Sequence, residues 1–370
     1  MDFVCLTIAI VSLFYTGLIL FFTAGWIRKR NFIKSSNINS TYISVVVAAR
    51  NEEKQIPFLL EALKGQSYKH FEVIIVDDHS TDNTSKIVSD FSINDKKLFH
   101  LPGDQHGKKA ALASGISQAE GELILTTDAD CIPGEKWLET IADFYEKEKT
   151  DFIIGSVKHS SNRTFLQKFI SLDFLALQAS GAGASEMNKP FICNGANLAF
   201  KKSLWNEVSK NINNKFASGD DVFLLHSALN KIPKANIRYL FSEEVIVSTP
   251  APKSISAFFN QRIRWASKAK GYKNSMAIIS SIIVFFMNFS LFGLFIGSFF
   301  SHYIACCFLI LFILKFIVDF PLLAYSAVFF NERKLLLYYL PLQIIYFLYT
   351  TVFAFCSMFK TYHWKERKLK

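Results

Sequence analysis

The sequence lacks the patterns that mark several common classes of enzyme and binding protein. It has no Gly-x-Gly-x-x-Gly and no Walker-type loop, which argues against a dinucleotide oxidoreductase and a phosphate-loop nucleotidase. Its six cysteines show neither a disulfide framework nor a zinc-binding spacing, as is typical of a reducing, cytosolic environment. A basic stripe interleaved with aromatic residues is also missing. The net charge of +10 is therefore explained better by anionic lipid headgroups and an anionic ligand than by nucleic acid.

The composition differs from that of an ordinary soluble enzyme. Of the 370 residues, 51% are hydrophobic and the mean hydropathy is +0.23, yet the middle of the chain is well charged. This combination predicts membrane segments around a soluble domain. The first apolar run, residues 3–27, is long enough to cross a bilayer, and basic residues 28–30 follow it. An anchor with its C-terminal end in the cytoplasm is favoured over a cleaved signal peptide, which would carry its charges before the apolar run.

Three more apolar runs lie near the other end, at residues 277–300, 303–330 and 335–359. Each is long enough to span a membrane. Lys315 and Asp319 are one helical turn apart in the middle run, and we expect them to pair, as a structural lock or where a lipid head enters. Simple crossings would place the basic tail outside the cell, whereas its charge favours the inside, so the topology stays open.

Between these apolar regions, short apolar runs alternate with amphipathic segments. Residues 43–47, 71–76 and 122–125 are typical of buried strands, and residues 53–63 and 84–91 have apolar positions at helical spacing. Repeated strand, loop and helix units predict an α/β fold with a mostly parallel sheet covered by helices on both faces. Ligands of such sheets bind beyond the carboxyl ends of the strands.

Acidic residues stand at these predicted strand ends. Asp128 and Asp130 follow one strand and can hold a divalent cation through oxygen ligands, which would neutralise a diphosphate. The pair by itself is also a common turn composition, so the neighbouring features decide. Asp78, after another strand, can accept hydrogen bonds from a base or ribose, and Lys108 opens a helix after a flexible Gly107.

Five motifs, in their order along the chain, resemble those of a known family. They are residues 45–53 (VVVAARNEE), 75–82 (IVDDHSTD), 127–130 (TDAD), 193–200 (CNGANLAF) and the Gln-x-x-Arg-Trp of residues 261–265. Together they resemble glycosyltransferase family 2, the inverting nucleotide-sugar transferases that include cellulose, chitin and hyaluronan synthases and ceramide glucosyltransferase. The resemblance covers residues 42–271 and implies a GT-A fold, with transmembrane helices at both ends of this chain.

The resemblance also implies roles for individual residues. Asp221 would be the catalytic base and Arg264 would lie near the leaving diphosphate. The expected donor-binding residues are Ala48, Arg50, Glu52, Asp78, Lys108 and Asp128. The expected acceptor-binding residues are Asn197, Asp220, Gln261 and Trp265. The expected ligands of Mg2+ or Mn2+ are Asp130 and Asp128, with Asp130 the direct one.

Two positions depart from the family pattern. Asp220 stands where the family usually has Glu, which leaves Asp221 as the base. At the start of a helical pattern, Asp221 is also a natural first-turn acid, and the helix dipole would keep it ionised. The family often has a Gly soon after the Trp, whereas residues 266–268 here are Ala-Ser-Lys.

The Gln-x-x-Arg-Trp segment allows two interpretations that can hold together. At helical spacing Gln261, Arg264 and Trp265 share one face. An interfacial helix is the alternative, in which phospholipids meet the basic residues and Trp265 sits in the aromatic belt. The basic residues concerned are Arg262, Arg264, Lys268 and Lys270.

Other reactive side chains are interpreted as structural. Five histidines have no paired metal-ligand spacing, and most are expected at the surface or in local hydrogen bonds: His100, His106, His159, His226 and His302. His79 adjoins the presumed pocket for the base. Cys131 is expected to pack as a small side chain and not to act as a nucleophile.

The combined prediction is a membrane-bound inverting glycosyltransferase that moves a sugar from a nucleoside diphosphate sugar, UDP favoured, to a hydroxyl of a membrane lipid or lipid-linked saccharide. A short processive polysaccharide synthase and a catalytically silent scaffold or sugar-nucleotide binding protein are the alternatives. We expect it in a bacterial inner membrane with the catalytic domain facing the cytoplasm. The expected segments are an anchor at 1–30, a catalytic domain at 42–250, an interfacial helix at 251–275, a membrane region at 276–360 and a basic tail at 361–370.

Overall fold

The computed structural model describes most of the chain. The described residues are 2–34, 40–94, 97–103, 106–160, 164–209, 219–232, 234–268, 271–359, 362–364 and 367–369. Lys270, part of the predicted linker and part of the predicted basic tail lie outside them.

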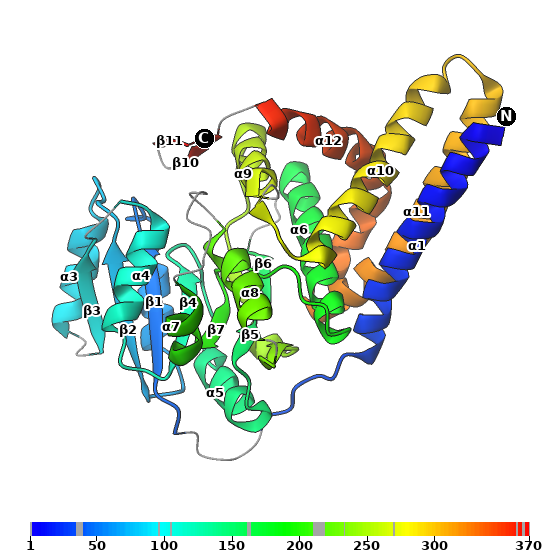
Figure 1. Ribbon diagram of the computed structural model, residues 1–370. Coiled ribbons are helices and arrows are strands. Elements are labelled where there is room, and N and C mark those ends of the chain that lie inside the picture. Colours follow the sequence, from blue (N-terminus) through cyan, green and yellow to red (C-terminus); the bar gives the residue numbers. More distant parts are fainter. Residues whose placement is uncertain are drawn as a thin grey trace.

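A seven-stranded sheet forms the centre of the half of the molecule that lies away from the long apolar helices (Figure 1). Its strands are β1 (Ile43–Ala49), β2 (Phe71–Asp77), β3 (Leu98–Pro102), β4 (Leu123–Asp128), β5 (Phe152–Ile154), β7 (Leu198–Lys201) and β8 (Ile237–Tyr239). They are ordered β3-β2-β1-β4-β7-β5-β8, with β3, β2, β1 and β4 parallel and β7 antiparallel to both of its neighbours. A small parallel pair joins β6 (Val157–His159) and β9 (Val247–Thr249). The predicted mostly parallel sheet is confirmed.

Side chains alternate between the two faces of the sheet along each strand. Both faces are buried, because helices cover each of them. Val46 of β1 belongs to the cluster that contains α4, whereas Val45 and Val47 belong to the cluster that contains α2 and α5. The helices around the sheet are α2 (Ile56–Lys64), α3 (Thr84–Asn94), α4 (Lys108–Gln118), α5 (Trp137–Glu148), α7 (Lys202–Val208) and α8 (Asp220–Lys231). The near-continuous apolar runs of the sequence therefore follow from burial on two faces.

Among the described residues, four helices are long and apolar enough to cross a membrane. They are α1 (Asp2–Arg28), α10 (Ser275–Gly297), α11 (His302–Phe329) and α12 (Tyr339–Phe359), the last preceded by the 3-10 segment η4 (Arg333–Tyr338). In Figure 1, α1, α10 and α11 run side by side as a bundle, whereas α12 lies at an angle to them, over α9 (Ile255–Lys268) and α6 (Phe165–Glu186). The predicted apolar runs are confirmed as helices. A further 3-10 segment, η2 (Glu243–Val245), precedes β9, and β10 (Tyr362–Trp364) and β11 (Arg367–Leu369) form an antiparallel pair.

Polar side chains hold this bundle together at one place. Lys315 forms an ion pair with Asp319, as predicted, and its Nζ also donates to Oε1 of Gln343 at 2.9 Å. Asp319 accepts a hydrogen bond from the hydroxyl of Tyr15 at 2.8 Å. A charge in hydrocarbon requires a partner, and these buried contacts supply partners for Lys315 and Asp319. They also connect α1, α11 and α12.

One long helix, α6 (Phe165–Glu186), was not predicted from the sequence. It begins with a capping box in which the Thr164 side chain accepts from the Gln167 backbone N–H. Near its other end it crosses α1 in backbone contact: a Cβ added to Gly25 would lie 2.0 Å from the carbonyl oxygen of Gly183. Small residues permit such close helix crossings. Through α6, the half of the molecule that contains the seven-stranded sheet packs directly on α1 and α11.

Candidate active site

A large cavity adjoins the carboxyl ends of the central strands. Its volume is about 780 Å³, and it extends from the end of β4 to the polar group between α1, α11 and α12. Several predicted site residues line it together: Lys108, Asp128, Asp130, Asp220, Asp221, Gln261, Arg264 and Trp265. The structure thus brings the predicted base, metal ligands and Gln-x-x-Arg-Trp side chains around one space, although they come from four separate elements.

The end of β4 offers oxygen ligands to a divalent cation. Ligand atoms of Asp128, Asp130 and Cys131 lie within 4.8 Å of one another. Asp128 forms an ion pair with Lys108, the first residue of α4. Burial, together with both carboxylates, raises the pKa of the Cys131 thiol well above its usual value, so the group stays protonated. The donor set is thus two carboxylates beside a neutral thiol, which suits a hard cation such as Mg2+ or Mn2+.

The predicted donor residues after β1 and β2 form a second group that does not line the cavity. Asp78 is buried and accepts a hydrogen bond from the Gly107 backbone N–H at 2.8 Å. Nη1 of Arg50 donates to the carbonyl oxygens of Asp78 (2.6 Å) and His79 (2.9 Å). The Glu52 backbone N–H donates to the Thr84 hydroxyl at 2.7 Å. Arg50 and Glu52 therefore connect the loops around Asp78, and Ala48 lies inside β1 beside Asp128 of β4.

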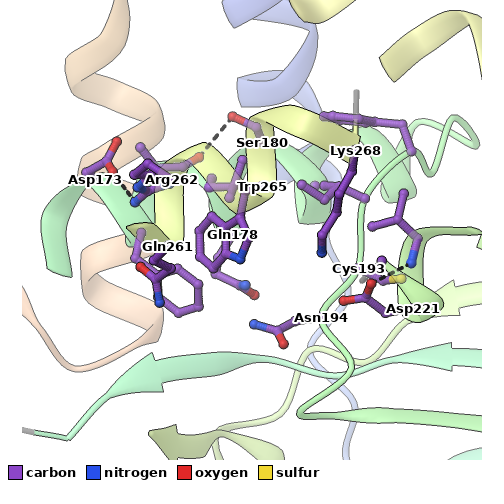
Figure 2. A pocket seen from close by; sticks show the side chains of 18 of the residues that line it. Asp173, Gln178, Ser180, Cys193, Asn194, Asp221, Gln261, Arg262, Trp265 and Lys268 are labelled. Carbon is purple, nitrogen blue, oxygen red and sulfur yellow. Dashed lines mark hydrogen bonds and ion pairs between the residues drawn. The ribbon is translucent and has the colours of Figure 1, made fainter. Parts of the chain in front are cut away.

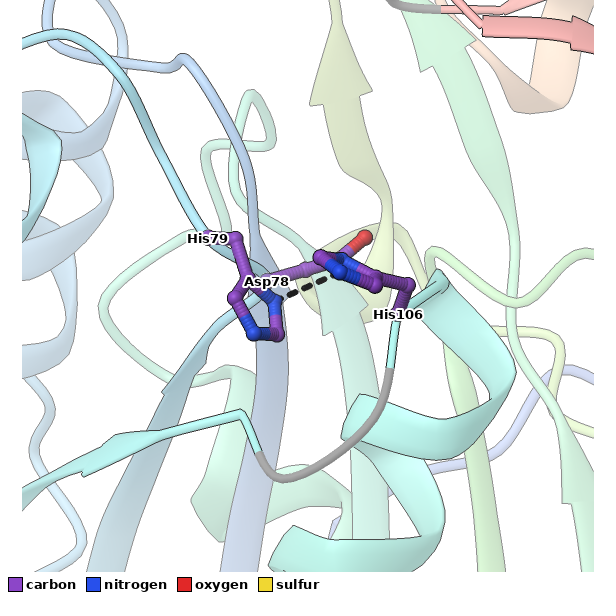
Figure 3. Close-up of side chains that lie close together, drawn as sticks. All are labelled: Asp78, His79 and His106. Carbon is purple, nitrogen blue, oxygen red and sulfur yellow. Dashed lines mark ion pairs between the residues drawn. The ribbon is translucent and has the colours of Figure 1, made fainter.

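Two histidines adjoin Asp78: His79, which follows it in the sequence, and His106, whose place there the sequence did not indicate. Nδ1 of His79 lies 3.5 Å from Oδ1 of Asp78, and the rings of His79 and His106 are 3.9 Å apart between centroids (Figure 3). Both histidines are exposed. The loop before α4 brings His106 to the loop after β2, so only the fold reveals the group.

The start of α8 positions the predicted base. Gly219 precedes it with φ of +101°, a conformation that a side chain would strain. The Asp221 carboxylate accepts hydrogen bonds from the backbone N–H of Gly195 (3.0 Å) and of Val222 (2.8 Å). Burial opposes its charge, but Lys268, these N–H groups and Lys108 outweigh burial and lower the pKa of Asp221. Asp221 is therefore ionised at neutral pH.

The neighbouring Asp220 behaves differently. Burial, only partly offset by Lys108 and Lys109, raises its pKa to about 6. Nζ of Lys109 lies 3.9 Å from Oδ1 of Asp220. Two adjacent acids thus have pKa values displaced in opposite directions by their surroundings.

Helix α9 forms the opposite wall and is fixed by buried polar contacts. Arg262 forms an ion pair with Asp173 of α6, and the Tyr349 hydroxyl of α12 donates to the same carboxylate at 2.5 Å. The Arg262 guanidinium also lies over the ring of Trp265, 4.6 Å from its centroid. Lys268 is buried and the Arg262 side chain is only 13% exposed, so both lie mainly against protein (Figure 2); the interfacial interpretation of the basic residues stays a prediction.

Asn197 does not have the predicted acceptor-binding position. Its Nδ2 donates to the carbonyl oxygens of Ser156 (2.8 Å) and Val245 (2.7 Å), and its Oδ1 accepts from Nε1 of Trp137 at 3.1 Å. All three contacts are in the core, so this amide connects strands and loops behind the cavity. Its neighbour Asn194 lines the cavity instead.

Several polar side chains of the cavity were not predicted from the sequence, among them Gln178, Asn194 and Lys268. Gln178 and Asn194 face its centre, and Lys268 extends toward them from the end of α9 (Figure 2). The one sequence feature that could have pointed to Lys268 is that Ala-Ser-Lys stands at residues 266–268, where the family often has a Gly. Gln178 had none, because α6 was not predicted.

Comparisons with known proteins agree with this arrangement. Residues 44–208 match the model of the family described as Glycosyl transferase family 2. Glycosyltransferase GlyG of Streptococcus pneumoniae is 32% identical over 197 residues, which are 50% of this chain and 64% of that protein. A poly-beta-1,6-N-acetyl-D-glucosamine synthase of Staphylococcus epidermidis is 27% identical over 256 residues, 65% of this chain and 59% of that protein. The chain thus spans about 60% of the length of these curated relatives.

A solved structure shares the fold over nearly the whole chain. The mannosyltransferase PcManGT from Pyrobaculum calidifontis, in complex with GDP-Man and Mn2+, superposes with a TM-score of 0.60 at 17% sequence identity. The likeness covers 94% of this chain and 99% of that one. The predicted GT-A-like fold is confirmed.

Proposed function

Because residues 44–208 form a glycosyl transferase family 2 domain in a GT-A-like fold, we propose that this protein is a membrane-bound inverting glycosyltransferase. It moves a sugar from a nucleoside diphosphate sugar to a hydroxyl of a membrane lipid or lipid-linked saccharide. The observation that carries this proposal is the cavity, which joins Asp128, Asp130 and Asp221 to side chains of the membrane helices.

The donor binds at the strand ends. Asp78 accepts hydrogen bonds from the base or ribose, and the exposed ring of His79 lies beside it. Asp128 and Asp130 hold Mg2+ or Mn2+, which when bound offsets negative charge on the leaving diphosphate. Arg264 and Lys108 add positive charge on the same diphosphate. The neighbour solved with GDP-Man and Mn2+ supports a nucleotide-sugar donor with a divalent ion; a UDP-sugar remains our favoured donor.

Asp221 supplies the base chemistry. Its ionised carboxylate takes the proton of the acceptor hydroxyl while the hydroxyl oxygen attacks the anomeric carbon. The bond from that carbon to the diphosphate oxygen breaks, and its electron pair leaves with the nucleoside diphosphate. One displacement inverts the anomeric centre, and no second acid is required because the leaving group is already stabilised by positive charge.

The acceptor approaches from the membrane helices. Gln261, Trp265 and Asp220 line that side of the cavity, together with Asn194, which replaces Asn197 in this role. Basic residues 28–30 at the end of α1 favour an orientation in which the catalytic half faces the cytoplasm at a bacterial inner membrane. An interfacial α12, consistent with its angle to the bundle, would keep the basic tail on that side as well.

A short processive polysaccharide synthase is a second candidate. The similarity to a poly-beta-1,6-N-acetyl-D-glucosamine synthase favours it. Four apolar helices are few for enclosing a polymer channel, which is why we prefer a single transfer to a lipid.

One assay tests the proposal. The purified full chain in detergent is supplied with UDP- and GDP-sugars, Mg2+ or Mn2+, and total membrane lipid, and products are separated by mass. We expect one glycosylated lipid, formed only with intact Asp221 and abolished by a metal chelator. Long polymer would instead establish the processive synthase, and absence of product with every donor would favour a silent scaffold.

A further inference from the structure

Lys268, the last residue of α9, is a buried cation that faces the cavity. Only 8% of the residue is exposed, and it lines the cavity between Asn194 and Asp221 (Figure 2). Within the described part of the chain, its ammonium forms no hydrogen bond and no ion pair within 4 Å. An ammonium has three donors, and burying them without partners costs free energy. The position therefore favours a ligand that brings negative charge.

Three other cations that line the cavity have carboxylate partners. Lys108 pairs with Asp128, Lys109 with Asp220, and Arg262 with Asp173. Asp221 is the carboxylate that acts most strongly on Lys268, but its two oxygens already accept backbone N–H groups of Gly195 and Val222. The donors of Lys268 are thus available to a bound molecule.

The side of the cavity on which Lys268 lies indicates which molecule binds to it. Burial lowers the pKa of Lys268, and Arg264 and Lys108 add to that effect, while Asp221 and Asp220, both at the start of α8, oppose it, Asp221 most strongly. Lys108 is instead the cation in contact with Asp128, on the side of the proposed diphosphate. Lys268 is therefore on the side of the base, and only a few residues separate it from the first residue of α10. A lipid phosphate lies at this boundary between protein and membrane.

We propose that the Lys268 ammonium binds a phosphate group of the acceptor lipid, close to the hydroxyl from which Asp221 takes the proton. This inference rests on the proposed function and gives the acceptor a chemical class, a phosphate-bearing lipid. Charge-assisted N–H···O⁻ hydrogen bonds provide the attraction, and they are about twice as strong as neutral ones. The amides of Gln178 and Asn194 face the same space and can bind further polar groups of the acceptor.

A binding experiment tests the proposal without requiring turnover. The purified full chain is titrated with dioctanoyl phosphatidic acid, with uncharged dioctanoylglycerol and, separately, with UDP and Mn2+. We expect Lys268→Gln to weaken binding of the phosphatidic acid about ten- to hundred-fold, with UDP binding unchanged. Lys268→Arg, which keeps the charge, should retain most of the affinity. Lys64→Gln, which removes an exposed charge at the end of α2, should behave like the unchanged protein.

Each other outcome would overturn the proposal. Weaker UDP binding in Lys268→Gln would assign the lysine to the donor diphosphate. Equal binding of phosphatidic acid by Lys268→Gln and the unchanged protein, or equal binding of phosphatidic acid and dioctanoylglycerol, would leave Lys268 without a role in phosphate recognition. Thermal unfolding scans of Lys268→Gln and Lys268→Arg identify a folding defect. If Lys268→Gln is unfolded, the binding of phosphatidic acid by Lys268→Arg decides whether the charge is required. Because binding is measured directly, failure of the transfer assay would overturn the proposed function without changing this result.

Discussion

The two ends of the cavity are built in different ways. At the donor end, Asp128 and Asp130 lie at and just beyond the end of β4 and line the cavity, whereas Asp78 follows β2, on the other side of β1, and is held outside the cavity by the Gly107 backbone N–H. At the membrane end, the wall depends on the ion pair of Arg262 of α9 with Asp173 of α6, a carboxylate that also accepts from Tyr349 of α12, so it joins helices far apart in the sequence. The donor end is thus fixed by local chain geometry, whereas the acceptor end depends on tertiary packing of helices.

The largest expected effect is at Asp221, where the two ends meet. Asp221→Asn keeps the shape of the side chain but removes the base, and we expect kcat to fall about 100- to 10,000-fold. UDP binding should be unchanged, because Asp128, Asp130 and Asp78 are untouched. The measurement is transfer rate together with UDP titration, and near-normal turnover would remove Asp221 from the mechanism.

Removing the cation of the helix contact should weaken the acceptor end alone. Arg262→Ala leaves Asp173 buried without its partner, and such losses cost about 3–5 kcal/mol of unfolding free energy. We expect a lower Tm and loss of acceptor binding, with UDP affinity retained. Arg238→Gln, which removes a half-exposed arginine paired with Glu148, is the matched control. If Arg262→Ala weakened UDP binding as strongly as acceptor binding, the two ends would not be independent.

Asn197→Ala separates a structural role from a binding role. The substitution leaves two buried carbonyl groups and the Trp137 N–H without partners, which should cost about 2–3 kcal/mol of stability. The KM for the acceptor should stay the same. Asn194→Ala should show the reverse, a higher acceptor KM with little change in Tm. A raised acceptor KM in folded Asn197→Ala would restore the role first predicted for it.

The smallest expected effect is an increase in the stability of the folded protein, in contrast to the losses predicted above. The pKa of Asp220 is about 6 in the folded protein and 3.8 ordinarily, so the folded chain binds the proton more tightly than the unfolded chain. Stability therefore rises as pH falls through about 6, and above that pH the buried charge is a cost. Asp220→Asn should stabilise the protein by about 2 kcal/mol at pH 7.5, and the gain should vanish near pH 4. Unfolding scans at both values test this, and a gain independent of pH would contradict it.

The same contrast explains what the sequence could predict. Asp128, Asp130 and Asp78 could be placed together because parallel strands end at one edge of a sheet. The shared face of Gln261, Arg264 and Trp265 followed from helical spacing. Asn197 was misplaced because a motif does not say toward which side a residue in a loop turns. Helix α6 was missed because it is buried on several sides and has no single apolar stripe.

Partners of the α9 residues could not be predicted by any local rule. Asp173 pairs with Arg262, and Tyr349 donates to the same carboxylate, only because α6 and α12 pack on α9. Lys268 is buried for the same reason, since a lysine at the end of an amphipathic helix next to a membrane segment would ordinarily extend to lipid headgroups. Such contacts become visible only when the helices are assembled.

The backbone contact between Gly25 and Gly183 changes where this protein can be divided. Residues 42–250 look like a separable unit in the sequence, but α6 lies inside them and carries the apolar surface that α1 and α11 cover. A fragment without the membrane helices would expose that surface and would be expected to aggregate. Trp26, whose indole N–H donates to the carbonyl oxygen of Ala179 at 2.7 Å, would be lost as well. A soluble form for assay or crystallisation should therefore be sought by covering this face of α6, for example with polar substitutions, and not by shortening the chain.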